Sequence, residues 1–427
     1  MKKIKKVILC LLVINTICIF PKSQGTIVKA KENKGDVGQI LDLDNLMEKA
    51  VENSIEVKNR KSTIESLENG FQDNINGTDS VYERIEKNER FKKLQNKSER
   101  TEDEQREYEY YQRNFGIPIT GEYELFQMLQ SANNLPVLGE FEMFQNKNAL
   151  EVDKNSVRQR VYEGYGKFLM EMDKLKLAKD KYKNVEDEYK NVEDEYKKSE
   201  VSYKTGVLSK TDYLAKKAEY LKEKGEFSNI DREFQKYNME FNKLVGEPLD
   251  KKYSSYKKDF NLDKSTLKSQ DEYIKEALEN RMEIKNGEEN ILVRRFESGS
   301  AKAVFSSEHN RERKLAEQKI QNAEDELELK KLDIKMEINL LYNDFEIKLV
   351  RLKNLEEGYK QAKKEYDESY KKYSLGMLSR LDFNRKNAEF IESSMDYKEA
   401  EREAYIAKLK LEFAASVGTD SKKVFYQ

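Results

Sequence analysis

The sequence predicts a mostly all-α protein built from duplicated, long, antiparallel coiled-coil hairpins. Three observations predict this class: a turn motif that occurs twice, a seven-residue apolar repeat that leads into each copy, and a near absence of proline. The chain of 427 residues has four prolines, and the long stretch from Pro248 to the C-terminus has no further one. Because proline breaks helix interiors, such a span favours very long helices.

The turn motif is Tyr-x-x-Gly-x-Leu-Ser-x-x-Asp followed by an aromatic residue, at 203–213 and 373–383. Glycine suits the left-handed conformation at a helix end, and serine can cap the returning helix with aspartate at its third position. Each motif is therefore predicted to be the tip of a helical hairpin. The tip residues are Gly206, Leu208, Ser209 and Asp212 in the first copy, and Gly376, Leu378, Ser379 and Asp382 in the second.

Apolar and aromatic residues recur every seven positions before each turn. The first series is Val161, Phe168, Leu175, Tyr182, Tyr189, Tyr196 and Tyr203; the second is Ile338, Phe345, Leu352, Tyr359, Tyr366 and Tyr373. The two series are in register, so that Ile338 corresponds to Phe168 and Tyr373 to Tyr203. A strict seven-residue repeat over six heptads imposes left-handed supercoiling. Both copies therefore approach their turn along a coiled-coil seam.

The copies also match at their starts, where 48–59 corresponds to 275–286. The distance along the chain from this start to the tip is longer in the first copy, so the first copy carries an insertion. The predicted organisation is a signal peptide at 1–25, a first helical repeat at 26–250 with a charged insertion at 71–146, and a second helical repeat at 251–427.

Helix lengths predict how each repeat packs. At 1.5 Å per residue, the helix 147–203 would be about 85 Å long, and 209–244 and 43–69 would be about 54 Å and 40 Å. In the second repeat, 308–373 would be about 99 Å, against about 57 Å for 379–416 and about 39 Å for 271–296. Each repeat is therefore expected to pair one long helix with two shorter helices stacked end to end.

The N-terminus has the pattern of a secretory signal peptide. Lysines at positions 2, 3, 5 and 6 precede fourteen mostly apolar residues, 7–20, which are too few to span a bilayer as a helix. A short uncleaved membrane anchor is the alternative. Both cysteines, Cys10 and Cys18, lie inside this segment, so the mature chain would have no thiol for disulfides, catalysis or metal binding. The mature chain is expected to work outside the cytoplasm.

Composition excludes several classes of function. Charged residues make up 37% of the chain with a net charge of −2, which gives no basic footprint for nucleic acid. His309 is the only histidine, most simply a solvated loop or helix-end residue, and the chain has no phosphate loop, nucleophile elbow or HExxH motif. We therefore expect neither an enzyme nor a bound cofactor or metal.

Three features of the sequence resemble the TolC-like outer membrane efflux protein family. They are the two tips, the terminal Val-Gly pairs, and the entry segments with Ala50, Asn53 and Glu56 or Ala277, Asn280 and Glu283. The resemblance covers most of the mature chain. It implies a homotrimer whose twelve helices form a tunnel, continued in that family by a β-barrel. It also implies an adaptor protein at the hairpin tips, an inner-membrane transporter, and a place in the cell envelope, in the outer membrane if the family role holds.

By this resemblance, the adaptor would be contacted by the tip residues Gly206, Leu208, Ser209, Gly376, Leu378 and Ser379. The candidates for a constriction of the tunnel are Asp212, Tyr373 and Asp382. Two positions depart from the family pattern: Arg385 replaces a second acid, and Leu378 replaces a basic residue. The aspartates could instead serve only as helix caps, and the tyrosines only as seam residues.

The region that forms the barrel in the family is different here. Residues 297–307 are too few for two membrane strands, and the highly charged stretch 82–113 is typical of helix or disordered loop. The β-barrel is therefore expected to be reduced or missing, which leaves membrane association expected but barrel insertion doubtful. We interpret the chain as a conduit component for efflux or type I secretion. A non-conducting envelope scaffold or spacer is the alternative.

Overall fold

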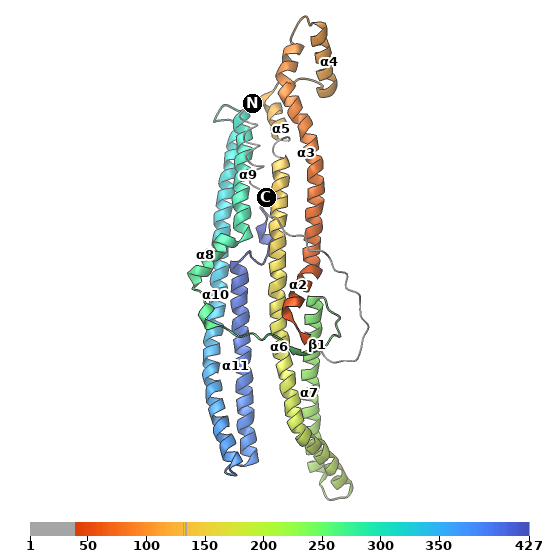
Figure 1. Ribbon diagram of the computed structural model, residues 1–427, viewed down its shortest axis with the longest axis vertical. Coiled ribbons are helices and arrows are strands. Elements are labelled where there is room, and N and C mark those ends of the chain that lie inside the picture. The colour runs from red at the N-terminus through yellow and green to blue at the C-terminus, as the bar shows by residue number, and fades with distance from the viewer. Residues whose placement is uncertain (1–38, 131, 133–134, 427) are drawn as a thin grey trace. The chain divides into compact units, whose positions relative to one another are not determined.

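The computed structural model describes residues 39–130, 132 and 135–426. The predicted signal peptide, with Cys10 and Cys18, lies outside the described residues. Within the described part the chain is almost entirely helical, and its two strands, Gln39–Leu41 (β1) and Tyr253–Tyr256 (β2), are short. The predicted all-α class with long antiparallel helices is confirmed (Figure 1).

The helices of the part before β2 are α2 (Leu43–Asn53), α3 (Ile55–Gln95), α4 (Glu102–Phe115), α5 (Glu122–Leu129), α6 (Leu135–Lys204) and α7 (Lys210–Val245). Those after β2 are α8 (Gln270–Asn280), α9 (Met282–Val304), α10 (Arg311–Ser374) and α11 (Arg380–Ala415), with short 3₁₀ turns η2 (Lys264–Thr266) and η3 (Ser421–Val424).

Each long helix packs against two shorter ones, as the helix lengths predict. Helix α10 contacts α11 toward the tip and α9 and α8 beyond it, and α6 contacts α7 and α3 in the same way (Figure 1). The 64 residues of α10 span about 96 Å, close to the sum of about 54 Å for α11 and about 35 Å for α9. A long helix and its two stacked shorter helices thus have nearly equal total lengths, so the long helix has a packing partner along most of its length.

Both entry helices are broken, which corrects the prediction of continuous helices at 43–69 and 271–296. A single extended residue interrupts each: Ser54 has φ −58° and ψ 129°, and Arg281 has φ −61° and ψ 135°. The two breaks are equivalent, since 48–59 aligns with 275–286 and this places Ser54 opposite Arg281. In the second repeat the residue at the break, Arg281, has a fully buried side chain.

The described residues of the charged insertion 71–146 are mostly helical. Helix α3 continues to Gln95, and α4 folds back on it, so the alternative of a disordered loop for 82–113 is wrong. Phe91 and Leu94 of α3 pack with Tyr111 of α4. The Asn88 side chain holds the following segment, with its Nδ2 donating to the Ile119 carbonyl at 3.0 Å and its Oδ1 accepting from the Ile119 N–H at 2.8 Å.

The predicted seam is present wherever its side chains are described. Ile338, Phe345 and Leu352 are buried, and farther along the aromatic rings of α10 stack with those of α11. Tyr359 lies 5.2 Å from Tyr397, and Tyr366 lies 4.9 Å from Phe390, measured between ring centroids. The corresponding side chains of the first repeat, 177–198, are outside the described part.

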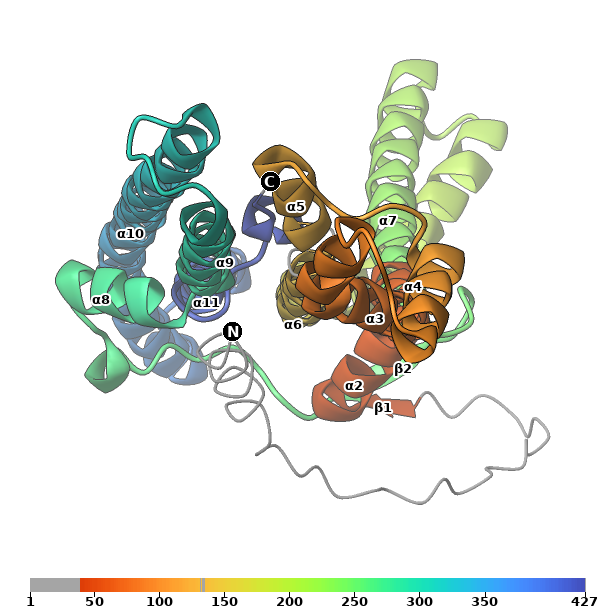
Figure 2. The ribbon, with the colours of Figure 1, turned by 90° about the horizontal axis from the view of Figure 1, so that it is seen from above.

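The two hairpins run side by side with their turns at the same end (Figures 1 and 2). Their inner helices, α6 and α11, are antiparallel: Tyr162 meets Phe413 and Asp173 meets Arg402. The linker between the repeats also joins them, because β2 pairs in parallel with β1 near the start of the chain. The repeat boundary at 250/251 lies just before β2 and stays a prediction.

A glycine substitution tests the tip geometry. Gly376 has φ +73°, so Gly376→Ala places a side chain in the left-handed region and should lower the free energy of unfolding by about 1–2 kcal/mol. Gly225 lies inside α7 with open space around it, so Gly225→Ala should instead raise stability by about 0.5–1 kcal/mol. Denaturant unfolding of both variants checks the pair, and an unaltered Gly376→Ala variant would contradict the turn assignment.

Candidate functional site

The candidate site is the pair of hairpin turns, between α6 and α7 and between α10 and α11. Their backbones are the same. The N–H of Val207 donates to the Ser202 carbonyl at 2.7 Å, and the N–H of Met377 donates to the Lys372 carbonyl at 2.8 Å. The intervening glycine has φ +76° in the first turn and +73° in the second. This left-handed helix ending satisfies carbonyls that would otherwise lack donors.

The serine and aspartate of each motif cap the returning helix. The Ser209 Oγ accepts from the Asp212 N–H at 3.1 Å and donates to the Asp212 carboxylate at 2.7 Å. Ser379 and Asp382 repeat both bonds at the same distances. Each cap is typically worth about 1 kcal/mol. The capping role that the sequence leaves open is therefore present at both aspartates, and a role in a constriction stays a prediction.

The tyrosine that ends each long helix stacks across its turn. Tyr203 lies 5.0 Å from Tyr213 with the rings 6° apart, and Tyr373 lies 4.8 Å from Phe383 with the rings 9° apart. Tyr373 remains 38% exposed. These tyrosines are therefore seam residues whose outer edge is open to solvent.

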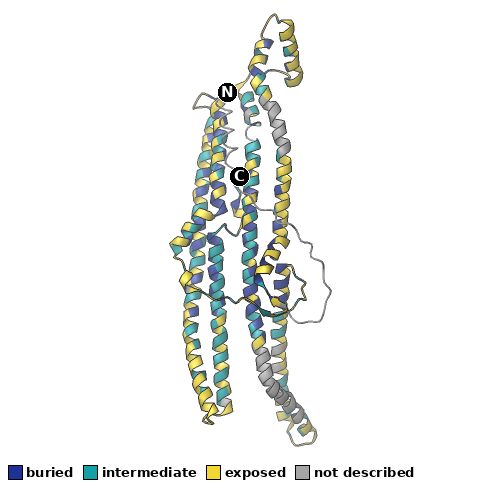
Figure 3. Ribbon diagram, viewed as in Figure 1, coloured by how far each residue is buried: buried dark blue, intermediate teal, exposed yellow. Residues whose placement is uncertain are grey.

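Apolar side chains project from both turns. Val207 is 80% exposed, and Leu375 and Met377 are each 73% exposed. The turn between α10 and α11 is coloured as largely exposed in Figure 3. The predicted site residues Leu208 and Leu378 are half-buried and support the turns instead. The turn motif did not identify these three exposed residues, although apolar residues next to a turn glycine, between charged helices, are a visible signal. An exposed apolar turn is typical of a contact surface.

The structure does not bring all the predicted constriction residues together. Asp212 contacts Ser209, and Asp382 contacts Ser379 and, weakly, Arg385 at 3.9 Å. Among the contacts between described residues, none joins Asp212 to Tyr373 or Asp382.

A buried ion cluster holds the two hairpins together above the tips. The Arg402 guanidinium on α11 donates to Asp259 from Nε at 2.9 Å and from Nη2 at 3.0 Å, and to Asp173 on α6 at 2.7 Å. Its side chain is 3% exposed. We name these three residues the Arg402 clamp. Toward the tips from the clamp, α6 and α11 border a cleft of about 310 Å³.

The clamp shifts the titration of Asp259. Burial alone would raise the pKa of the Asp259 carboxyl, but the hydrogen bonds and charge of Arg402 outweigh it and hold the pKa below its usual value. A carboxyl with a lowered folded-state pKa adds stability above its unfolded pKa of about 4 and loses it as the pH falls further. The clamp is therefore fully formed at neutral pH.

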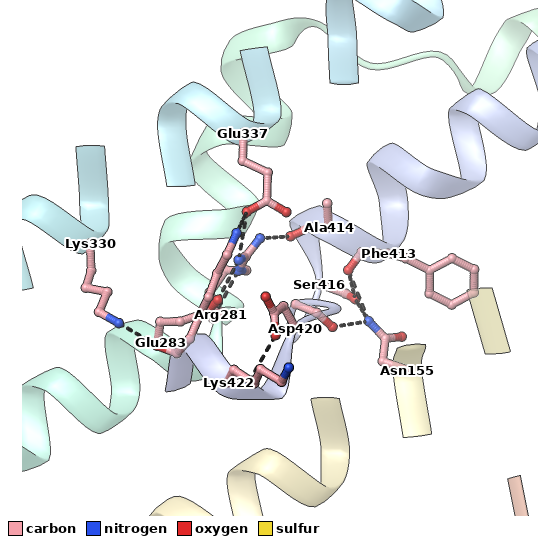
Figure 4. A network of polar contacts seen from close by, with 12 residues as sticks. Asn155, Arg281, Glu283, Lys330, Glu337, Phe413, Ala414, Ser416, Asp420 and Lys422 are labelled. Carbon is pink, nitrogen blue, oxygen red and sulfur yellow. Dashed lines mark hydrogen bonds and ion pairs between the residues drawn. The ribbon is translucent and has the colours of Figure 1, made fainter. Parts of the chain in front are cut away.

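A second polar cluster lies at the break in the entry helix of the second repeat (Figure 4). Arg281 is fully buried; it pairs with Glu283, reaches Glu337 at 3.2 Å, and donates to the Ala414 carbonyl at 3.0 Å. The Asn155 amide of α6 donates to the Gly418 carbonyl at 2.7 Å. This cluster ties the C-terminal end of α11 to the start of α9 and to the first repeat.

No family model and no curated protein matches the sequence. Solved structures do match. A membrane protein from Pseudomonas aeruginosa aligns with a TM-score of 0.54 and 12% identity over 93% of this chain and 97% of its own. The Campylobacter jejuni CmeC outer membrane channel aligns with a TM-score of 0.53 and 11% identity over 96% of each chain.

CusC, whose structures describe transmembrane channel formation, aligns with a TM-score of 0.50 and 11% identity over 93% of this chain and 99% of its own. The chain has the TolC-like fold. The duplicated hairpins and the tips of this TolC-like chain are therefore those that the sequence predicted. At these identities the likeness is one of fold. Among the described residues of the TolC-like chain, every helix lacks the apolar length that a membrane crossing requires.

The clamp can be tested against a matched surface ion pair. Arg402→Met leaves Asp173 and Asp259 without their buried partner, so the free energy of unfolding should fall by about 2–3 kcal/mol. Arg351, on α10, pairs with Glu403 at 2.7 Å but is 48% exposed, so Arg351→Met should cost less than about 1 kcal/mol. Denaturant unfolding at pH 7 measures both. Equal losses would show that the clamp is no stronger than a surface pair.

Proposed function

We propose that this chain is a passive conduit component of the cell envelope, serving efflux or type I secretion outside the cytoplasm. Three copies would form a helical tunnel whose hairpin tips meet an adaptor protein, which in turn engages an inner-membrane transporter. One observation carries the proposal: two turns of the same geometry, at the same end of the molecule, both present exposed apolar side chains. A solitary rod would gain nothing from exposing Val207, Leu375 and Met377 to water.

The chemistry of the turns supports docking of a protein. Leu375 and Met377 stand between Lys371, Lys372 and Arg380, so an apolar centre has a cationic rim. Interfaces commonly combine an apolar centre with a polar rim. The helices that carry the two turns are capped and antiparallel. Binding of a partner at the turns would therefore cost little conformational entropy of this chain. CmeC is an outer membrane channel and CusC forms a transmembrane channel, and the conduit role is proposed by analogy with them.

Assembly in detergent separates the conduit from a scaffold of single chains. Residues 26–427, purified at micromolar concentration in mild detergent, should have the mass of three chains by light scattering. A tunnel needs closure by several copies, whereas a spacer does not. The matched control is the same chain in mild denaturant below its unfolding transition, which should dissociate. A stable single chain in detergent and in lipid would contradict the conduit.

Conductance tests the predicted constriction. In planar bilayers, Asp212→Asn combined with Tyr373→Ala should raise the conductance of the assembled protein at least twofold, because both changes remove groups proposed to narrow the tunnel. Asp231→Asn with Tyr123→Ala alters the same residue types away from the tips and should leave the conductance unchanged. Tyr123, on α5, is also exposed, at 56%. Equal conductance of both double variants and the parent would reject the constriction while leaving the assembly standing.

A further inference from the structure

The segment that follows α11 lies across both repeats. The chain turns at Gly418, which has φ +94°, and residues 419–426 then contact α6 of the first repeat and α9 and α10 of the second. We name residues 419–426 the strap. Val424 and Tyr426 are buried, whereas its other residues are half-buried or exposed. The strap is therefore held by two anchoring side chains rather than along its whole length.

Side-chain amides of the helices bind the backbone of the strap. On α6, Gln145 Oε1 accepts from the Tyr426 N–H at 2.6 Å, and Gln145 Nε2 donates to the Tyr426 carbonyl at 3.4 Å. On α9, Asn286 Nδ2 donates to the Val424 carbonyl at 2.6 Å. Asn148 donates to Asn286 Oδ1 at 2.6 Å and so keeps the Asn286 amide turned toward the strap. Bonds to a peptide backbone supply affinity for an extended segment of almost any sequence.

The pocket around the Tyr426 ring supplies the selectivity. The Tyr426 hydroxyl donates to the Glu283 carbonyl at 2.8 Å. A Cβ added at Gly287 would lie 2.5 Å from the hydroxyl oxygen, so the ring fits because residue 287 has no side chain. Phe141 and Val293 pack against the ring. A phenylalanine would fill the same space without the bond to the carbonyl, so the pocket favours tyrosine.

A polar group beside these contacts has no partner. Asn290 is 1% exposed and lies on α9 between Asn286 and Val293, on the face that contacts the strap. Among the described residues, none donates to its Oδ1. A buried amide oxygen without a donor costs free energy. The groove therefore has an acceptor to spare for an N–H of a bound segment.

The attachment between the anchors and Gly418 is weak. Lys423 Nζ donates to Glu337 at 3.1 Å, and the Lys330 ammonium donates to the Lys423 carbonyl at 2.7 Å. The Lys423 side chain is 49% exposed, so water and salt screen its ion pair. Before the strap, the chain is fixed, because Asn155 binds the Gly418 carbonyl at 2.7 Å (Figure 4). The strap can thus leave the groove while α11 stays in place.

We propose that the groove between α6, α9 and α10 is a peptide-binding site and that the strap is its tethered occupant. A partner peptide with an aliphatic residue two positions before a tyrosine would replace the strap. This pattern follows from the two anchors, Val424 and Tyr426. The site lies beyond the end of α11 that is away from its turn, so it is independent of the conduit role.

The polar lining favours an occupant that exchanges. The amides of Gln145, Asn148, Asn286 and Asn290 line the groove. An interface that stays closed is more simply filled by apolar residues, because paired amides gain little and unpaired buried amides are costly. When the strap leaves, amides can bind water, whereas an apolar lining would be exposed at a cost. A groove of this kind can therefore stand open between occupants.

Peptide binding to the purified full chain tests the site. Val424→Ser with Tyr426→Ser removes both anchors, so the tethered strap should no longer compete for the groove; its effective concentration is on the order of millimolar. A fluorescein-labelled peptide with the sequence of residues 419–427 should bind this variant at least tenfold more tightly than the parent, by fluorescence anisotropy. The helical circular dichroism should be unchanged. Equal affinities, or no binding to the variant, would overturn the proposal.

Matched glycine changes locate the bound peptide. In the same variant background, Gly287→Ala should weaken peptide binding at least tenfold, because its Cβ enters the tyrosine pocket. Gly299→Ala, on the same helix but with open space around it, should leave the affinity unchanged. A peptide with phenylalanine in place of the tyrosine should also bind at least tenfold more weakly. Equal effects of the two glycine changes, or equal affinities of the two peptides, would reject this site.

Hydrogen exchange of the unaltered chain needs no substitution. A strap that leaves by itself exposes its amides without opening a helix, so residues 420–426 should exchange at least tenfold faster than 284–293 of α9. Excess free peptide should speed the exchange of the strap at least threefold further, because it keeps the strap displaced. No response to the peptide would overturn the replacement. Light scattering should show an unchanged mass, and a fall in mass would mean that straps exchange between copies, which contradicts a tethered occupant.

Discussion

The pairing of one long helix with two shorter ones is the constraint on which the rest of the structure depends. A helix of 64 or 70 residues has no globular core to bury its apolar face, so its stability rests on a partner along its whole length. The stacked pair supplies that partner. The junction between the two stacked helices is the weakest point of this pairing. In the second repeat, the buried Arg281 and the C-terminal segment close that junction.

Duplication explains why the turns agree so closely and the junctions do not. The tip is set by local chemistry, a left-handed glycine and a serine–aspartate cap, and both copies keep it with hydrogen bonds of equal length. The junctions are set by distant contacts. Ser54 stands where Arg281 stands, and a groove lined by Glu56 and Gly246 borders it. The copies have thus diverged where each one meets different neighbours.

The sequence could predict the features that local patterns determine. Heptad spacing, the absence of proline and the turn motif predicted the hairpins, and α7 and α11 begin one residue after the predicted caps Ser209 and Ser379. It could not predict the Arg402 clamp, because the partners Asp173 and Asp259 lie 229 and 143 residues away. It also missed the breaks at Ser54 and Arg281, since a single extended residue leaves the helical pattern on either side intact.

The ion cluster that holds the two hairpins together differs from the charged groups that the chain exposes on its surface. The buried Arg402 clamp joins the hairpins within a copy, and its counterpart Arg232 is exposed on α7. An ion cluster around a buried arginine resists separation, whereas an exposed pair contributes little and is screened by salt. A chain built in this way keeps its two hairpins together as one unit.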